Sequence, residues 1–160
     1  MPARHRRGFT LVEVLVVIGI AALLLAVAIP KLAPAVATER ARATDEGLAD
    51  AMSYARQYAL NTSDLVMFTP NGCGYSVTRS SGAQLLSASA TAPQNVSCTP
   101  LPTAVAFLGD GSAEPCTGSG ATLACTSPPP NWTASSKVTA SGTTWQLSLN
   151  SGGLVTSTVQ

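Results

Sequence analysis

Hydrophobic and polar positions divide the 160-residue chain into two unlike parts. The run from Phe9 to Ile29 is apolar except for Thr10 and Glu13. As a helix it is about 30 Å long at ~1.5 Å per residue, which matches the thickness of a bilayer core. The pattern predicts a transmembrane helix over residues 9–30.

A second helical pattern follows Pro30 and Pro34, each of which removes a backbone donor and can kink or loosen a helix. Residues 31–61 are predicted to be the amphipathic second half of the helix, with a stripe that packs on a sheet. The stripe contains Leu48, Met52, Ala55 and Ala59, with Tyr58 beside them. The other faces carry charges that we expect on a solvated surface or between neighbouring helices: Glu39, Arg40, Arg42, Asp45, Glu46 and Asp50.

Short runs typical of β-strands fill residues 62–160, separated by turn pairs such as Asn71-Gly72 and Ser141-Gly142. In one run Trp145, Leu147 and Leu149 alternate with polar residues, which predicts one buried face. The predicted strands are Leu65–Thr69, Tyr75–Arg79, Gln84–Ser89, Ala104–Leu108, Thr122–Cys125, Lys137–Ala140, Thr143–Leu149 and Leu154–Val159, and the segment from Pro115 to Trp132 is predicted to be an irregular loop. These patterns predict a chain of the α+β class, with a long N-terminal helix packed on an antiparallel β-domain.

The basic residues before the apolar run predict its orientation. Arg4, Arg6 and Arg7 favour a cytoplasmic N-terminus, which leaves the β-domain on the other side of the membrane. Glu13 is the exception within the run, because a carboxylate costs ~2.5–3.5 kcal/mol near the bilayer centre and less near an interface. A plain membrane anchor explains the length and orientation of the helix but has no use for Glu13.

All four cysteines lie in the β-domain, whereas the single histidine, His5, lies before the apolar run. This distribution argues against a Cys/His zinc site and favours two disulfides in an oxidising compartment. Three pairings are possible; we favour Cys116 with Cys125, closing a short Gly-rich loop, and Cys73 with Cys98.

The stretch Gly8-Phe9-Thr10-Leu11-Val12-Glu13 resembles the signature of type IV prepilins and type II secretion pseudopilins. The resemblance covers residues 4–30 and implies a leader peptide, residues 1–8, that a prepilin peptidase removes after Gly8. It implies N-methylation of the new terminal residue, Phe9. Glu13 then becomes an assembly residue, whose carboxylate pairs with the free N-terminal amine of a neighbouring subunit and so relieves a buried charge.

The resemblance implies a structural role in a type IV pilus or a type II secretion pseudopilus. The subunit would wait in the bacterial inner membrane, single-pass with its β-domain in the periplasm, and then join the filament. Its partners would be the peptidase, the membrane and other pilin or pseudopilin subunits. The helix sequence LADAMSYARQYAL is similar to that of the GspH/FimT-type minor pilins and pseudopilins, with Leu48, Met52, Ala55, Arg56 and Ala59 at the matching positions; the alternative for Arg56 is an ordinary surface charge.

Enzymatic chemistry has little support in the sequence. Cleavage after Gly8 would leave a chain without histidine, which excludes a Ser-His-Asp triad or a Cys-His pair. Gly118-Ser119-Gly120 lacks the lysine of a phosphate-binding loop. We expect no enzyme, no cofactor and no metal site.

A DNA-binding minor pilin of natural transformation is the alternative function. Such a protein should carry clustered basic residues on its outer domain. After Arg56 the only basic residues are Arg79 and Lys137, which makes nucleic acid the less favoured partner.

Overall fold

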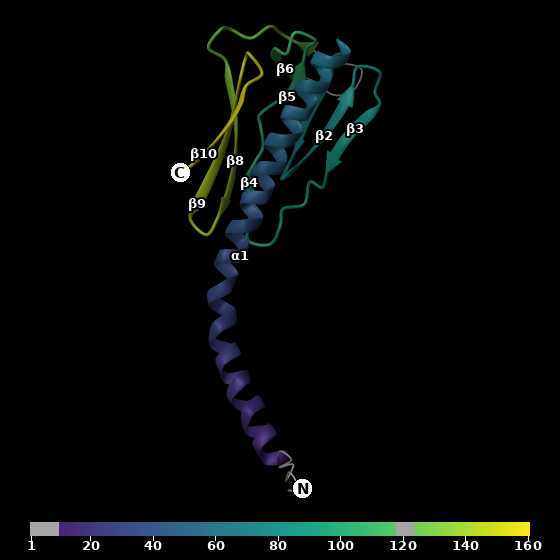
Figure 1. The fold of residues 1–160 in the computed structure, drawn as a ribbon. Coiled ribbons are helices and arrows are strands. Elements are labelled where there is room, and N and C mark those ends of the chain that lie inside the picture. The colour runs from purple at the N-terminus through teal and green to yellow at the C-terminus, as the bar shows by residue number, and fades with distance from the viewer. Residues whose placement is uncertain (1–9, 118–123) are drawn as a thin grey trace, which may run out of the picture. The chain divides into compact units, whose positions relative to one another are not determined.

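The computed structural model describes residues 10–117 and 124–160, and the chain divides into two compact units, Met1–Ala35 and Val36–Gln160 (Figure 1). Helix α1 (Leu11–Thr62) passes through the boundary between the units. Pro30 and Pro34 lie inside it without ending it. The prolines, which the sequence predicts can kink or loosen the helix, therefore do not end it.

The part of α1 in the second unit buries one stripe of side chains. Its members recur every three or four residues, which places them on one face of a helix: Ala37, Ala41, Asp45, Leu48, Met52, Ala55 and Ala59. The helix ends at Thr62, whose hydroxyl donates to the Tyr58 carbonyl oxygen at 2.8 Å, and the next residue, Ser63, has a positive φ of 52°. The stripe predicted from Leu48 to Ala59 is confirmed, and it extends further towards the N-terminus.

Ten strands follow α1 in the described chain, and every pairing between them is antiparallel. One sheet has the order β3-β2-β1-β5-β6-β7. Its strands are β1 (Val66–Asn71), β2 (Gly74–Arg79), β3 (Gln84–Ala88), β5 (Ala104–Phe107), β6 (Ala113–Thr117) and β7 (Ala124–Cys125). The other has the order β10-β9-β8-β4, with β4 (Ser97–Thr99), β8 (Thr133–Ala140), β9 (Thr143–Asn150) and β10 (Val155–Val159).

The hydrophobic core lies between the stripe of α1 and the inner faces of both sheets. Phe68 and Phe107 come from the first sheet, and Trp145, Leu147 and Leu149 come from the second. In Figure 1 the C-terminal half of α1 runs along both groups of strands. The buried alternation of β9 agrees with the pattern predicted for Thr143–Leu149.

The predicted loop from Pro115 to Trp132 is wrong in part. It contains most of β6, which was not predicted as a strand. The strand predicted at Thr122–Cys125 overlaps β7, which pairs with β6 through Cys116 and Cys125. The sequence prediction also missed β4 and began β8 four residues late, at Lys137 instead of Thr133. The cause in β6 is Pro115, because a proline inside a short run is normally evidence against a strand.

Candidate functional site

The first turn of α1 is closed by Thr10, the residue before the helix. The Thr10 carbonyl oxygen accepts hydrogen bonds from the Glu13 and Val14 N–H groups at 3.1 and 3.3 Å. The Thr10 hydroxyl accepts a further bond from the Glu13 N–H at 3.2 Å. Thr10 is therefore the N-cap, and Glu13 occupies the third helical position, the spacing of a Thr-x-x-Glu capping box.

This geometry gives Glu13 a second physical reason for its place in an apolar run. The N-terminus of a helix carries the positive end of its dipole, and a carboxylate in the first turn is stabilised by about 0.3–1 kcal/mol. The Glu13 side chain is exposed. Thr10 and Glu13 thus start the helix and leave a carboxylate accessible beside that start.

The apolar side chains that follow are exposed in the first unit. Leu11 is 80% exposed and Leu23 73%, and the same holds for the other large apolar side chains of this segment: Val12, Val14, Leu15, Val16, Val17, Ile18, Ile20, Leu24, Leu25, Ile29 and Leu32. A continuous apolar surface of this kind is typical of a segment that is covered by lipid or by other protein chains.

The length and composition of this segment were compared with the requirements of a membrane span. Taken singly, no helix in the described chain is both long and apolar enough to cross a membrane. The pair Leu11–Ala26 and Ala28–Thr62, bent at the break between them, meets the requirement together. The predicted cleavage and methylation residues, Gly8 and Phe9, lie outside the described residues.

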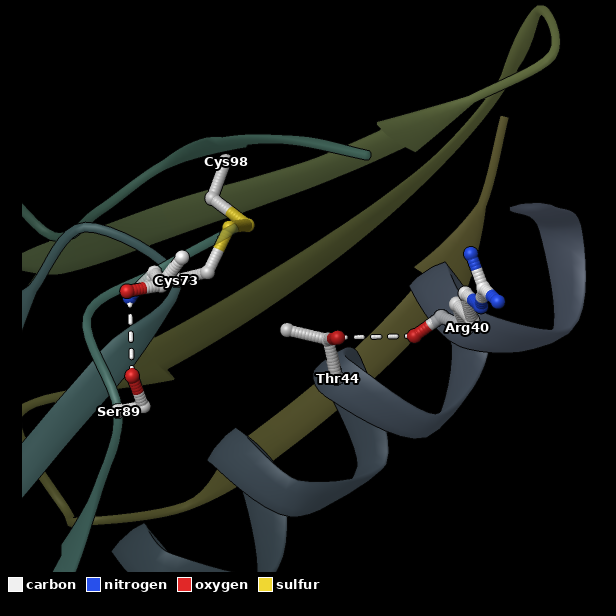
Figure 2. The surroundings of a disulfide bond; sticks show 6 residues. Arg40, Thr44, Cys73, Ser89 and Cys98 are labelled. Carbon is white, nitrogen blue, oxygen red and sulfur yellow. Dashed lines mark hydrogen bonds between the residues drawn. A yellow bond between two sulfur atoms is a disulfide. The ribbon is translucent and has the colours of Figure 1, made fainter. Parts of the chain in front are cut away.

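The cysteines form two disulfides in the second unit. Cys73, in the turn between β1 and β2, is joined to Cys98 in β4, so this disulfide links the two sheets (Figure 2). The Cys73 N–H also donates to the Ala90 carbonyl oxygen at 3.3 Å. Cys116 is joined to Cys125 across the pair β6–β7. The first disulfide therefore fixes the packing of two layers, and the second fixes a sheet edge.

Arg56 is half-buried and connects α1 to two turns of the β-domain. Its Nε donates to the carbonyl oxygen of Gly111, in the β5–β6 turn, at 2.9 Å. Gly153, in the β9–β10 turn, lies against the same side chain, where an added Cβ would be 2.8 Å from Arg56 Nε. Arg56 is thus a residue that positions turns in the fold, rather than the ordinary surface charge considered above.

Asp45 is buried, with 2% of its surface exposed, which corrects the expectation of a solvated charge. Its Oδ2 accepts a hydrogen bond from the Ser157 hydroxyl of β10 at 2.6 Å, whereas Oδ1 has no hydrogen-bond partner among the described residues. Burial raises the pKa of Asp45, the Ser157 hydrogen bond lowers it, and repulsion from Glu46 raises it further. Periodicity could have revealed this residue, because Asp45 lies four positions after Ala41 and three before Leu48.

Arg79 and Lys137, the two basic residues after Arg56, lie in different sheets and do not form a basic cluster of the kind that binds nucleic acid. Arg79 donates from Nε to Asp64 Oδ2 at 2.9 Å and lies 5.8 Å from the centre of the Tyr58 ring. Hydrogen bonds from Ser80 and Arg79 lower the pKa of the Asp64 carboxyl. Lys137 is in β8, in the other sheet. Arg79 is therefore part of a structural contact at the end of α1.

Metal ligands are also not gathered in the described chain. Within residues 10–117 and 124–160, no group of three or more histidine, cysteine, aspartate or glutamate side chains could hold an ion. The cysteines there are all in disulfides.

Comparison with known proteins found similarity in the N-terminal sequence and in the fold. Residues 3–29 match the family model described as the prokaryotic N-terminal methylation motif. The structure resembles two crystal structures of the type IV minor pilin FimU from Pseudomonas aeruginosa. One gives a TM-score of 0.55 at 16% identity over 74% of this chain and 88% of that chain, and the other gives 0.51 at 16% over 73% and 91%.

The chain has the pilin fold seen in FimU and carries the prokaryotic N-terminal methylation motif. This result confirms the predicted fold class and the resemblance to type IV pilins. A search of curated proteins found no match. At 16% identity the likeness to FimU concerns the fold, so the role of the chain is argued below from its own residues.

Proposed function

We propose that this chain is a minor pilin or pseudopilin: a structural subunit that is cut after Gly8, methylated at Phe9 and assembled through α1. The apolar surface of residues 11–35 carries the proposal. In the inner membrane this surface would face lipid, and in a filament it would face the helices of other subunits. Both environments keep the side chains away from water, which makes transfer between them physically reasonable.

Glu13 would supply the directional contact during this transfer. Cleavage after Gly8 creates an amine at Phe9, one residue before the Thr10 cap. The carboxylate of one subunit and the amine of the next are opposite charges in an apolar environment, where an unpaired charge is expensive and a correctly placed partner relieves the cost. The pair would set the register between neighbouring subunits.

The outer domain would keep its shape while α1 changes surroundings. The disulfide between Cys73 and Cys98 and the contact of Arg56 with Gly111 both tie strands or turns together within the second unit. These contacts would help the domain to keep its fold as a filament subunit. The periplasm, an oxidising compartment, would allow both disulfides to form.

Two variants of Glu13 separate pairing from helix capping. Glu13→Gln removes the charge but keeps a side chain that suits the capping box, whereas Glu13→Ala removes both. Full-length variants are expressed in cells that carry the peptidase and the filament machinery. We expect both to insert into the membrane and both to be depleted at least tenfold from the sheared filament fraction.

Normal incorporation of Glu13→Gln together with loss of Glu13→Ala would assign capping alone to Glu13 and remove the pairing role. Normal incorporation of both variants would contradict any role of Glu13 in assembly. Asp50→Asn, an exposed carboxylate elsewhere on α1, is the control for a general effect of charge.

A further inference from the structure

A groove of about 530 Å³ lies between α1 and strand β10 of the second unit, and we refer to it as the β10 groove. One wall is formed by charged helix residues, including Glu39, Arg42 and Glu46. The opposite side includes Trp145 and Val159, and Asp45 and Ser157 meet between the two sides. All of these residues belong to the second unit, so the groove is a feature of one compact body.

The charge in the groove is unbalanced. Glu39, Asp45 and Glu46 contribute three carboxylates, and Arg42 is the one cationic side chain among the residues that line it. Arg42 Nε is already bound to Glu46 Oε1 at 2.8 Å. An occupant that adds positive charge would therefore be complementary to this surface.

Asp45 is the residue of the groove with which such a positive charge would pair. Only 2% of the surface of this residue is exposed, and its Oδ1 has no hydrogen-bond partner among the described residues. Leaving a buried carboxylate oxygen without a donor is costly, so a donor supplied by another chain would be stabilising here. The Ser157 hydroxyl satisfies Oδ2 alone.

The apolar side of the groove suits the remainder of a long cationic side chain. Val159 is 65% exposed although it lies in the same sheet face as Trp145, its register partner in β9. Lysine and arginine carry aliphatic stems that pack on apolar surfaces while their charged ends reach a polar partner. β10 is also the edge strand of its sheet in the described chain, so a neighbouring chain can approach it.

We infer that the β10 groove is a contact site for a neighbouring filament subunit, which places a lysine or arginine side chain against Asp45. The stem of that side chain lies on Val159 and Trp145, and its charged end donates to the free carboxylate oxygen. This inference rests on the proposed function, because it names a second contact of the same subunit outside the helix start. Glu13 would set register, and Asp45 would select a neighbour with a complementary outer surface.

Site-specific photo-crosslinking in cells tests the inference with the full-length chain. The photoreactive amino acid p-benzoylphenylalanine replaces Val159 at the edge of the groove, and in a second strain it replaces Leu15 in the apolar segment. We expect the Val159 position to give an adduct with a filament subunit, joined within a few residues of a lysine or arginine. We expect Asp45→Asn to reduce the yield of this adduct at least fivefold.

Asp50→Asn is the matched control, since Asp50 is an exposed aspartate on the same helix that does not line the groove. It should leave the adduct unchanged. Asp45→Asn keeps the shape of the side chain and an oxygen for Ser157, and its thermal unfolding is measured in parallel. An unchanged adduct in correctly folded Asp45→Asn would contradict the inference.

The Leu15 position separates failure of the inference from failure of the proposed function. Adducts at Leu15 with none at Val159 would overturn the groove contact and leave filament assembly in place. No adduct with filament subunits at either position would overturn both. An adduct of Val159 with lipid, with a protein outside the filament or with an acidic segment of a subunit would also overturn the inference.

Discussion

The guanidinium Nε of Arg56 donates to the carbonyl oxygen of Gly111 at 2.9 Å, across 55 residues of the chain. This bond joins the last turns of α1 to the β5–β6 turn, and Gly153 of the β9–β10 turn lies against the same side chain. A single helix residue therefore holds turns from both sheets.

Replacement of Arg56 should loosen this end of the domain. Arg56→Met keeps most of the aliphatic stem and removes the donor, and a hydrogen bond to a charged group contributes about 1.5–3 kcal/mol. We expect the free energy of unfolding to fall by that amount in chemical denaturation. Arg40→Met, an exposed arginine on the same helix, should change it little; equal effects of the two would contradict the role of Arg56.

Gly153 has a positive φ of 71° and close neighbours. A side chain at this position would therefore be destabilising both through backbone strain and through steric clashes. A Cβ there would collide with the Gly111 carbonyl oxygen and with Arg56. Gly142 has a similar φ of 85° but nothing within 4 Å of an added Cβ. We expect Gly142→Ala to destabilise by about 1 kcal/mol through backbone conformation alone and Gly153→Ala by clearly more. Equal losses in thermal unfolding would show that the contact with Gly111 is unimportant.

The two disulfides should contribute unequally to stability. Cys73–Cys98 spans 25 residues and Cys116–Cys125 spans 9. In the chain-entropy description, loss of the first costs about 3.5 kcal/mol and loss of the second about 2.6 kcal/mol. Paired Cys→Ala variants, unfolded by denaturant under oxidising conditions, measure both values. A larger loss for the shorter loop would contradict this ranking.

Asp45 should make stability depend on pH. Its pKa is raised in the folded state, chiefly by burial, so the folded protein binds a proton more tightly than the unfolded chain does. The stability contributed by this group is then greatest below the ordinary pKa of 3.8 and is lost as the pH rises through the higher folded pKa. Asp45→Asn should remove this slope and be the more stable protein near neutral pH. Parallel stability–pH curves for the two proteins in that window would contradict the assignment.

The sequence predicts the parts of the fold that have a strong period. The stripe from Leu48 to Ala59 and the alternation from Trp145 to Leu149 both follow from helical and strand spacing, because burial on one face imposes that spacing. β4 is too short to show a period, with three residues from Ser97 to Thr99. β6 contains Pro115, whose presence normally argues against a strand, and pairing with β5 and β7 overrides that preference.

The residues of the candidate site also divide into those that a local sequence pattern predicts and those that depend on distant partners. The resemblance to prepilins depends on a local stretch of sequence, so Gly8, Phe9 and Glu13 could be proposed without the structure. The spacing Thr10-x-x-Glu13 is itself a local signal for the helix start that the structure shows. The contacts of Asp45 and Arg56 cannot be predicted from the sequence, because their partners, Ser157 and Gly111, are 112 and 55 residues away and only the folded chain brings them together.

Mass spectrometry of the mature N-terminus tests the central claim most directly. The full-length protein is isolated from cells with an active prepilin peptidase, and from matched cells without the peptidase as the control. The proposed function predicts a chain that begins at an N-methylated Phe9 in the first sample and retains residues 1–8 in the second. An intact leader in both samples would contradict the account.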